Sequence, residues 1–310
     1  MSRTLSADWV LPVEGEPIQN GAVVIEAGRI TAVGSASELG EGECFEDAVI
    51  VPGFVNAHTH VEYAVYGGFG DALADFADWI TLHTERKWRI GWDDYLAIAR
   101  AGAAENLASG VTTIGDCSYS GAAAVACAEL GLRAIVYLEV FGDDPAASLA
   151  RMAENRARAE DSFSDRVRPA VSPHTPFTVS LEVYRACAEL GLPMATHISE
   201  SASEVAYVTA GDGPWAAFRT LLVEPAGTTG TRMLAAAGLL GPNVLAAHCV
   251  KVDAEEIAPL PTAPVRTPSW DAAWRRLRSF AKRGCASGSV RTVPRRHRRS
   301  TSSRSSEASC

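Results

Sequence analysis

The sequence predicts an α/β fold built from short apolar strands that alternate with alanine-rich helices. From residue 51 onward, apolar runs of strand length are separated by helical stretches. Residues 127–132 and 187–192 repeat the pattern Cys-Ala-Glu-Leu-Gly-Leu, and each copy leads directly into a strand. Glycine in that position ends a helix in the left-handed conformation without a steric penalty. Such alternation implies a parallel sheet, either a closed barrel or a doubly wound sheet.

Six strands are expected in this part of the chain. They cover residues 53–58, 112–116, 134–140, 168–172, 194–197 and 244–250, and helices are expected at 94–109, 121–130 and 181–190. The first strand is not followed by the Gly-x-Gly-x-x-Gly pattern, which argues against a dinucleotide-binding sheet. A closed (β/α)8 barrel needs eight strands, so a barrel formed from these six is incomplete.

The first 50 residues have a different pattern. Residues 21–28 and 29–34 are apolar runs separated by a glycine turn, which predicts a β-hairpin. Further short strands around this hairpin indicate a small β-sheet unit. We therefore divide the chain into residues 1–50, a main α/β domain at 51–260, and a tail at 261–310.

The composition is that of a globular protein with a large core. The chain has 310 residues, of which 47% are hydrophobic, and a formal net charge of −9. This charge gives no overall attraction to nucleic acid or to anionic membranes. The first residues lack an apolar run of signal-peptide length, and no run approaches the ~18 residues of a membrane span. The seven cysteines are unpatterned, which favours reduced thiols and a cytoplasmic location.

The strongest local signal is the end of the first strand, which reads His58-Thr59-His60. Residues two apart on a strand point to the same face, so the two imidazoles project side by side. Paired imidazoles suit Zn²⁺, Fe²⁺ or Mn²⁺. The alternative is that these are simply two polar residues at the end of a strand.

Three further histidines strengthen the metal interpretation. His174, His197 and His248 also follow or end predicted strands, and Glu200 comes three residues after His197. A satisfied core histidine explains any one of them, but not five at the same end of one sheet. Glu200 by itself could equally be a solvated acid that opens a helix, where the helix dipole favours it.

These residues carry a resemblance to a known family. The segments Pro-Gly-Phe-Val-Asn-Ala-His58-Thr-His60, Thr-His197-Ile-Ser-Glu200 and Ala-Ala-His248-Cys-Val resemble three strand motifs of the amidohydrolase superfamily. The most similar branch contains the chlorohydrolases and the adenosine-type deaminases, including methylthioadenosine/S-adenosylhomocysteine deaminases and aminofutalosine deaminases. The resemblance implies a (β/α)8 barrel with a small β-sandwich.

The resemblance also implies the roles of the site residues. His58, His60 and His197 would be ligands of one divalent metal ion, with Zn expected ahead of Fe or Mn. Glu200 would be the proton shuttle and His248 would lie beside the metal-bound water. His174 would contact a small-molecule substrate.

The implied reaction is hydrolytic deamination of an aminated heterocycle, with a purine nucleoside-like compound as the expected substrate. Metal-bound hydroxide would attack the ring carbon that carries the amino group. Glu200 would protonate the ring nitrogen and then the leaving ammonia. Glu85 is a candidate for binding substrate hydroxyls, although a surface glutamate explains it equally well. The alternative within the superfamily is a dechlorinating or other triazine-type hydrolase.

The chain departs from the family pattern after His248. The expected Gly-Thr-Asp strand, whose Asp is a metal ligand and general base, is absent from the sequence. Residues 261–310 instead contain 12 Lys and Arg against two acids. One interpretation is a basic nucleic-acid-binding arm on an inactive fragment. We favour the other, a shifted reading frame that begins near residue 258, and it predicts a disordered tail and impaired activity. The sequence leaves the oligomeric state open, including a homo-oligomer.

Overall fold

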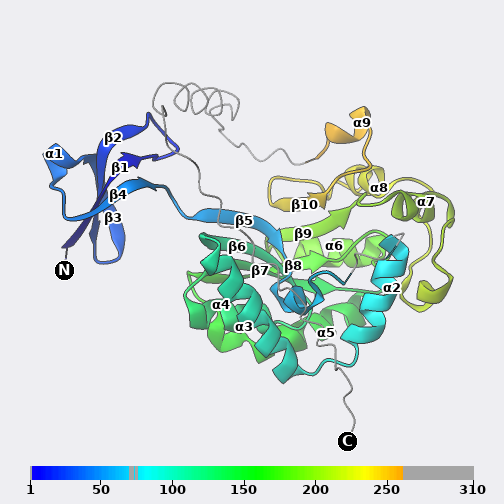
Figure 1. Cartoon of the computed structure of the whole chain (residues 1–310). Helices are drawn as coiled ribbons and strands as arrows, with labels where there is room; N and C mark the ends of the chain where they lie inside the picture. Colours follow the sequence, from blue (N-terminus) through cyan, green and yellow to red (C-terminus); the bar gives the residue numbers. More distant parts are fainter. Residues whose placement is uncertain (1, 70–72, 74–75, 261–310) are drawn as a thin grey trace, which may run out of the picture. The chain divides into compact units, whose positions relative to one another are not determined.

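The computed structural model of the chain describes residues 2–69, 73 and 76–260, which form two separate β-sheets with their helices (Figure 1). The tail predicted at residues 261–310 lies outside the described residues. Its boundary and its origin therefore stay predictions. Within the described residues, no helix combines the length and the apolar character that crossing a membrane requires.

The N-terminal sheet has four strands in the order β3-β2-β1-β4. Its strands are β1 Ser2–Val10, β2 Ile18–Glu26, β3 Arg29–Ser35 and β4 Glu43–Ile50, and the short helix α1 Ala36–Leu39 follows β3. The first three strands pair antiparallel, whereas β4 pairs parallel with β1. The turn between β2 and β3 is Ala27-Gly28, both with positive φ, as two-residue hairpins require. The predicted hairpin is confirmed.

The second sheet has six parallel strands in the order β10-β9-β8-β7-β6-β5. They are β5 Phe54–Thr59, β6 Val111–Ser118, β7 Arg133–Val140, β8 Val167–Pro173, β9 Met194–Ile198 and β10 Val244–His248. All six predicted strands are confirmed, with differences at their ends. Although β5 and β10 are the two edges of the sheet, the rings of His58 and His248 are only 5.2 Å apart. The sheet therefore curves as a barrel wall does.

Helices connect these strands and cover their outer face (Figure 1). The longer ones are α2 Phe76–Lys87, α3 Trp92–Ala108, α4 Ala122–Leu130, α5 Pro145–Arg158, α6 Leu181–Glu189, α7 Ala202–Ala210 and α8 Gly230–Ala236. The short ones are the 3-10 turns η1 Val61–Tyr66, η2 Glu160–Ser162 and η3 Ala216–Leu221, and helix α9 Ala254–Ile257. The three helices predicted from the sequence correspond to α3, α4 and α6. Helices α3 and α4 pack on β6, α5 on β7 and α6 on β8.

Local sequence explains where several of these helices begin and end. Asp144, Ser180 and Ser201 each accept a hydrogen bond from a backbone N–H in the first turn of the helix that follows, which satisfies a donor that the helix itself leaves free. The two Cys-Ala-Glu-Leu-Gly-Leu copies place Gly131 and Gly191 at positive φ of 74° and 65°. The predicted left-handed ends of both helices are therefore confirmed.

The core of the barrel wall consists of small and branched apolar side chains. Val136, Leu138 and Val140 of β7 are no more than 1% exposed, and so are Ala122, Ala123 and Ala124 of α4. Alanine lets the helix approach the strands closely, and a strand buried on both faces has a nearly continuous apolar sequence. This packing fixes the strands, and their carboxyl ends then carry the polar residues.

One glycine is required by the close approach of neighbouring strands. An added Cβ at Gly115 of β6 would overlap the carbonyl oxygen of Ala57 in β5 and lie 3.4 Å from the Tyr137 ring. We expect Gly115→Ala to lower the free energy of unfolding by about 1–3 kcal/mol, the typical cost of overpacking. Urea denaturation measures this difference. Gly67→Ala is the control, because its Cβ would meet its nearest atom, the Ala64 carbonyl oxygen, at 3.8 Å. Equal stability of the two variants would contradict the prediction.

Candidate active site

All five histidines predicted at strand ends meet at one cavity of about 270 Å³. His58 and His197 lie within β5 and β9, His248 is the last residue of β10, and His60 and His174 directly follow β5 and β8. The carboxyl ends of parallel strands share one edge of a sheet, so residues more than 180 positions apart come together there. Glu200 also lines this cavity.

Three of these imidazoles form a tight cluster. One ring nitrogen from each of His58, His60 and His197 lies within 4.8 Å of the others. The Nε2 atoms of His60 and His197 are 3.2 Å apart. Because each neutral imidazole has one lone pair, two lone pairs converge on the same small volume. A divalent cation placed there would satisfy both, and three imidazoles are an established ligand set for zinc.

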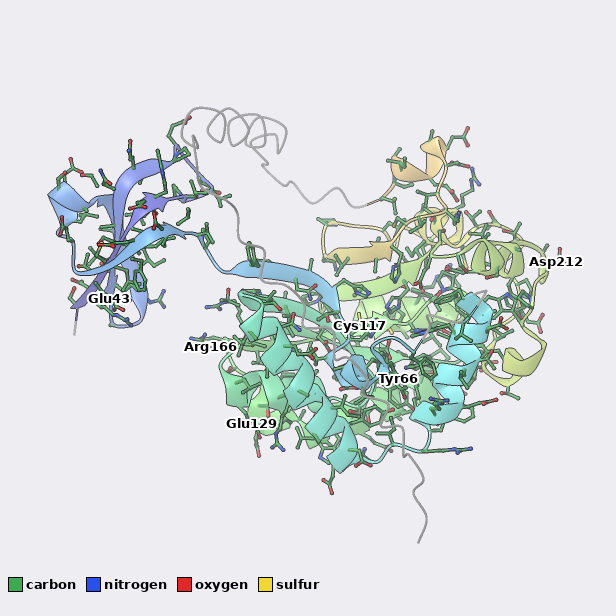
Figure 2. The ribbon with its side chains drawn as sticks, viewed as in Figure 1. Glu43, Tyr66, Cys117, Glu129, Arg166 and Asp212 are labelled. Atoms are coloured by element: carbon green, nitrogen blue, oxygen red, sulfur yellow. The ribbon has the colours of Figure 1, made fainter. Side chains whose placement is uncertain are left out.

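Backbone carbonyls fix how two of these rings are turned. His60 Nδ1 lies 2.9 Å from the carbonyl oxygen of Cys117, whose position in the barrel Figure 2 labels. His197 Nδ1 lies 2.8 Å from the carbonyl oxygen of His174. A carbonyl oxygen can only accept, so each Nδ1 carries the proton and donates. Each Nε2 is therefore left as an acceptor or metal ligand that faces the cavity.

Burial keeps the cluster uncharged. Loss of solvation, together with a smaller effect of neighbouring histidines, lowers the pKa of His58 to about 4 and that of His197 to about 3. The same loss of solvation lowers the pKa of His60 and of His174 well below the usual value. The neutral form is the one that binds metal ions, so at neutral pH the site is ready for a cation without first losing protons.

Burial shifts the pKa of Glu200 in the opposite direction from the pKa values of the histidines. Its burial, and then the charge of Glu204, raise its pKa to about 7. A carboxyl group with this pKa can give and accept a proton near neutral pH. Its Oε2 atom is 3.5 Å from Nε2 of His248. Glu200 and His248 therefore lie side by side at the cavity, and their predicted roles as proton shuttle and as neighbour of the metal-bound water stay predictions.

Glu204 holds Glu200 in place, and this role was not predicted from the sequence. The two carboxylate oxygens of Glu204 accept the backbone N–H groups of Ser199 and Glu200, each at 2.8 Å. Ser199 has φ 52°, a left-handed conformation that is uncommon for serine and is stabilised here by that carboxylate. The spacing Ser201-x-x-Glu204 is a capping-box pattern and was a signal that the sequence offered.

One wall of the cavity is aromatic and apolar. It is formed by Phe76, Trp79 and Ile80 from α2 and by Phe177 from the loop after β8. Behind this wall, Ala77, Trp215 and Phe218 are buried and continue the same cluster. The wall joins α2 to a loop more than 90 residues later in the chain, and only the fold brings the two together.

Glu85 lies elsewhere. It is on the exposed side of α2 and does not line the cavity, in contrast to Trp79 on the same helix. The other buried charged groups near the site were not predicted. Glu139 in β7 has its carboxylate within 4.8 Å of ring nitrogens of His174 and His197, and Lys87 ends α2 in a buried position.

Together these features allow a specific kind of chemistry. The cluster of neutral imidazoles can hold a divalent cation, and Glu200 can transfer protons beside it. The aromatic wall can hold a flat ring against both. The arrangement suits hydrolysis at a carbon atom of a planar substrate.

Comparisons with known proteins place this chain among similar sequences and folds. The sequence profile of the amidohydrolase family matches residues 49–286. The chain is 31% identical over 267 residues to the 5-methylthioadenosine/S-adenosylhomocysteine deaminase of Symbiobacterium thermophilum, covering 80% of this chain and 58% of that protein. It is 30% identical over 246 residues to the 5′-deoxyadenosine deaminase of Methanothermobacter thermautotrophicus, covering 75% and 54%.

A solved structure has a similar fold. An adenosine deaminase from Xanthomonas campestris, crystallised with bound zinc, superposes with a TM-score of 0.65 at 22% identity, covering 83% of this chain and 59% of that one. The predicted (β/α)8-type fold is thereby confirmed. The chain spans little more than half the length of the curated relatives that it matches, 58% and 54%.

The cluster of His58, His60 and His197 leads to a direct prediction about zinc binding. We expect the purified chain to bind about one Zn²⁺ after dialysis, and His197→Ala to lose most of it, because two of three ligands remain. Elemental analysis of protein dialysed against metal-free buffer measures the ratio. His83→Phe is the control, since it also removes a buried imidazole but lies outside the cluster. Retention of stoichiometric zinc by His197→Ala would show that this cluster is not the metal site.

Proposed function

This chain belongs to the amidohydrolase family, and on that premise we propose that it is a metal-dependent aminohydrolase acting on a purine nucleoside-like heterocycle. The observation that carries the proposal is the joint placement of a neutral three-histidine cluster and a carboxyl group of raised pKa in one cavity. Deaminases among the relatives support the same reaction.

His58, His60 and His197 are the proposed ligands of one divalent cation, with Zn²⁺ the first candidate. The Nε2 atoms of His60 and His197 point to the same volume, because the Nδ1 atom of each ring is hydrogen-bonded to a backbone carbonyl oxygen. This geometry fits a divalent cation. When bound, a divalent cation lowers the pKa of water and so supplies a nucleophile near neutral pH. Because the imidazole ligands are neutral, the site keeps the full positive charge of the cation, and this charge favours the lowered pKa of the bound water.

Glu200 is the proposed acid and base. In its protonated form it donates to a ring nitrogen of the substrate, which makes the neighbouring ring carbon more electrophilic. In its ionised form it accepts a proton that the leaving amino group then needs. A pKa of about 7 lets both forms be populated near neutral pH. Glu204 keeps the carboxyl group aimed into the cavity through the backbone of residues 199 and 200.

His248 and His174 complete the polar side of the cavity. The side chain of His248 faces Glu200 and is 27% exposed, and loss of solvation lowers its pKa. As a neutral ring it can accept or donate one hydrogen bond to the attacking water. His174 has its Nδ1 atom 2.8 Å from Thr178 Oγ1, which leaves its Nε2 atom for the substrate.

The aromatic wall and the charges define the substrate class. Stacking on Trp79 and Phe177 suits a purine ring. Among the described residues that line the cavity, none is lysine or arginine, so the site offers no countercharge to a phosphate. We therefore expect 5′-deoxy or 5′-thio adenosine compounds ahead of nucleotides, in agreement with the compounds named for the relatives. The role of Glu85 in binding hydroxyls stays a prediction.

The reaction is tested by a substrate panel. We expect ammonia release from 5′-deoxyadenosine or methylthioadenosine and none from AMP, because no lysine or arginine is among the described residues that line the cavity. The rate is expected to be low, since the sequence lacks the family's Gly-Thr-Asp pattern. The assay therefore uses enzyme in excess over substrate and follows a single turnover.

Two comparisons interpret that panel. Silence with nucleosides, together with halide release from a chlorinated triazine, would favour the triazine-type alternative. A version whose coding sequence is restored to the family frame after residue 258 is run in parallel. If the given chain is as soluble and as active as that version, the shifted-frame interpretation of residues 261–310 is wrong.

Glu200 gives the sharpest single substitution. We expect Glu200→Gln to lower the single-turnover rate by about 10²–10⁴-fold, the usual contribution of a positioned proton-transfer group. Zinc content should stay unchanged, because Glu200 is outside the ligand cluster. The control is Glu189→Gln, an exposed glutamate in α6. A rate within threefold of the wild-type rate, about 0.7 kcal/mol in activation free energy, would remove Glu200 from the mechanism.

A further inference from the structure

A buried ammonium group lies directly behind the cavity. Lys87 is the last residue of α2 and only 7% exposed. Its Nζ atom donates to Tyr63 Oη at 3.2 Å. It lies 3.8 Å from the centroid of the Tyr119 ring and 5.1 Å from that of Phe141. Lysine is among the residues least often buried, so this position calls for a compensating role.

Two buried carboxyl groups face this ammonium, from two other elements. Glu62 in η1 is fully buried, and it accepts hydrogen bonds from Ser118 Oγ and from the backbone N–H groups of Ser120 and Ala123. Glu139 in β7 is 5% exposed; a hydrogen bond with Tyr63 favours its ionised form, but its Oε2 atom has no hydrogen-bond partner among the described residues. Glu139 therefore depends on Lys87 more than Glu62 does.

The same ammonium argues against a second metal site. Glu139, His174 and His197 bring three ligand atoms within 4.8 Å of one another, a grouping that could hold a cation. Lys87 already supplies positive charge to Glu139, and its charge also opposes protonation of His174. Lys87 and a divalent cation would therefore compete for the charge of the same carboxylate.

The main chain of Lys87 is held as well. Its carbonyl oxygen accepts a hydrogen bond from Tyr95 Oη of α3 at 3.0 Å. The end of α2 is thus tied to α3 through its backbone and to η1 through its side chain. These ties lie at the opposite end of α2 from Phe76 and Trp79, which line the cavity.

A column of stacked and edge-on rings connects Lys87 to the histidine cluster and to the aromatic wall of the cavity. Tyr63 stacks on His60 with ring centroids 5.1 Å apart and meets His83 edge-on at 4.4 Å. His83 in turn stacks on Trp79 at 4.8 Å. The hydroxyl of Tyr63 is the atom that Lys87 holds. One side chain therefore fixes the middle of a column that runs from a proposed metal ligand to the cavity wall.

We propose that Lys87 is a positioning residue that fixes helix α2, and with it the aromatic wall of the cavity, against the barrel. The effect on substrate binding rests on the proposed function, whereas the effect on α2 does not. The wall contacts the ring of the substrate before and during the reaction. Loss of its placement should therefore weaken binding more than it slows the chemical step.

Hydrogen–deuterium exchange and steady-state kinetics test this with Lys87→Met, which keeps most of the length and apolar volume but removes the charge. We expect faster exchange in the peptide that covers residues 76–87, with the β6 and β7 peptides unchanged. KM should rise about tenfold and kcat should change less than about threefold. Zinc content should remain at the wild-type ratio. Arg89→Met is the matched control, because it removes an exposed charge two residues further on.

Two more variants keep the test decisive. Lys87→Met leaves Glu139 buried without its countercharge, so Lys87→Met/Glu139→Gln removes both charges and should recover overall stability while α2 still exchanges fast. Lys87→Arg keeps the charge and should exchange more slowly than Lys87→Met. Wild-type exchange in residues 76–87 of Lys87→Met would overturn the proposal, and so would equally raised exchange in the barrel strands of the double variant. If the wild-type chain deaminates nothing, the proposed function fails, yet the exchange data still decide the role of Lys87.

Discussion

Two hydrogen bonds from imidazole Nδ1 atoms to backbone carbonyls set the condition on which the site depends. His60 donates to Cys117 and His197 donates to His174. Because the acceptors belong to strands β6 and the end of β8, the orientation of each ring is determined by the register of the sheet. Both Nε2 lone pairs then point at the same volume. If the strand register were not fixed, the Nε2 atoms of the same histidines would not point to one common volume.

The electrostatics follow from the same burial. Apolar strands and the wall from α2 exclude water, so each histidine is held neutral and Glu200 is held near its protonation midpoint. Opposite requirements are thereby met within one cavity, since a metal ligand must be unprotonated and a proton shuttle must be able to hold a proton. The backbone is strained at this edge, where Ser199, His248 and Cys249 all have positive φ. Glu204 and the neighbouring backbone hydrogen bonds hold that strained segment.

Helix α2 connects the substrate side of the cavity to the charges beneath it. Its first turns carry Phe76 and Trp79 and its last residue is Lys87. The column of rings through Tyr63 and His83 connects that lysine to the aromatic wall of the cavity by direct ring contacts. Placing a charged residue in the interior is unfavourable unless it is paired. The negative charges of Glu139 and Glu62 favour the charged form of Lys87, and an apolar side chain of equal size would have no such interaction.

The sequence alone determined the positions of the six strands, the two helix ends at Gly131 and Gly191, and the set of five histidines with Glu200, because periodicity, turn chemistry and strand-end position are local properties. The resemblance of its motifs implied His58, His60 and His197 as the ligand set, and these three cluster in the structure. The sequence did not determine the contributions of Glu204, Glu139, Lys87 and Phe177. Glu204 left a capping-box signal, but the others did not. A buried Glu and Lys look like surface residues in a sequence, and only the tertiary structure brings β7 and α2 together. Glu85, two residues before Lys87, shows the limit well: which of the two faces the interior was decided by the helix phase against the barrel.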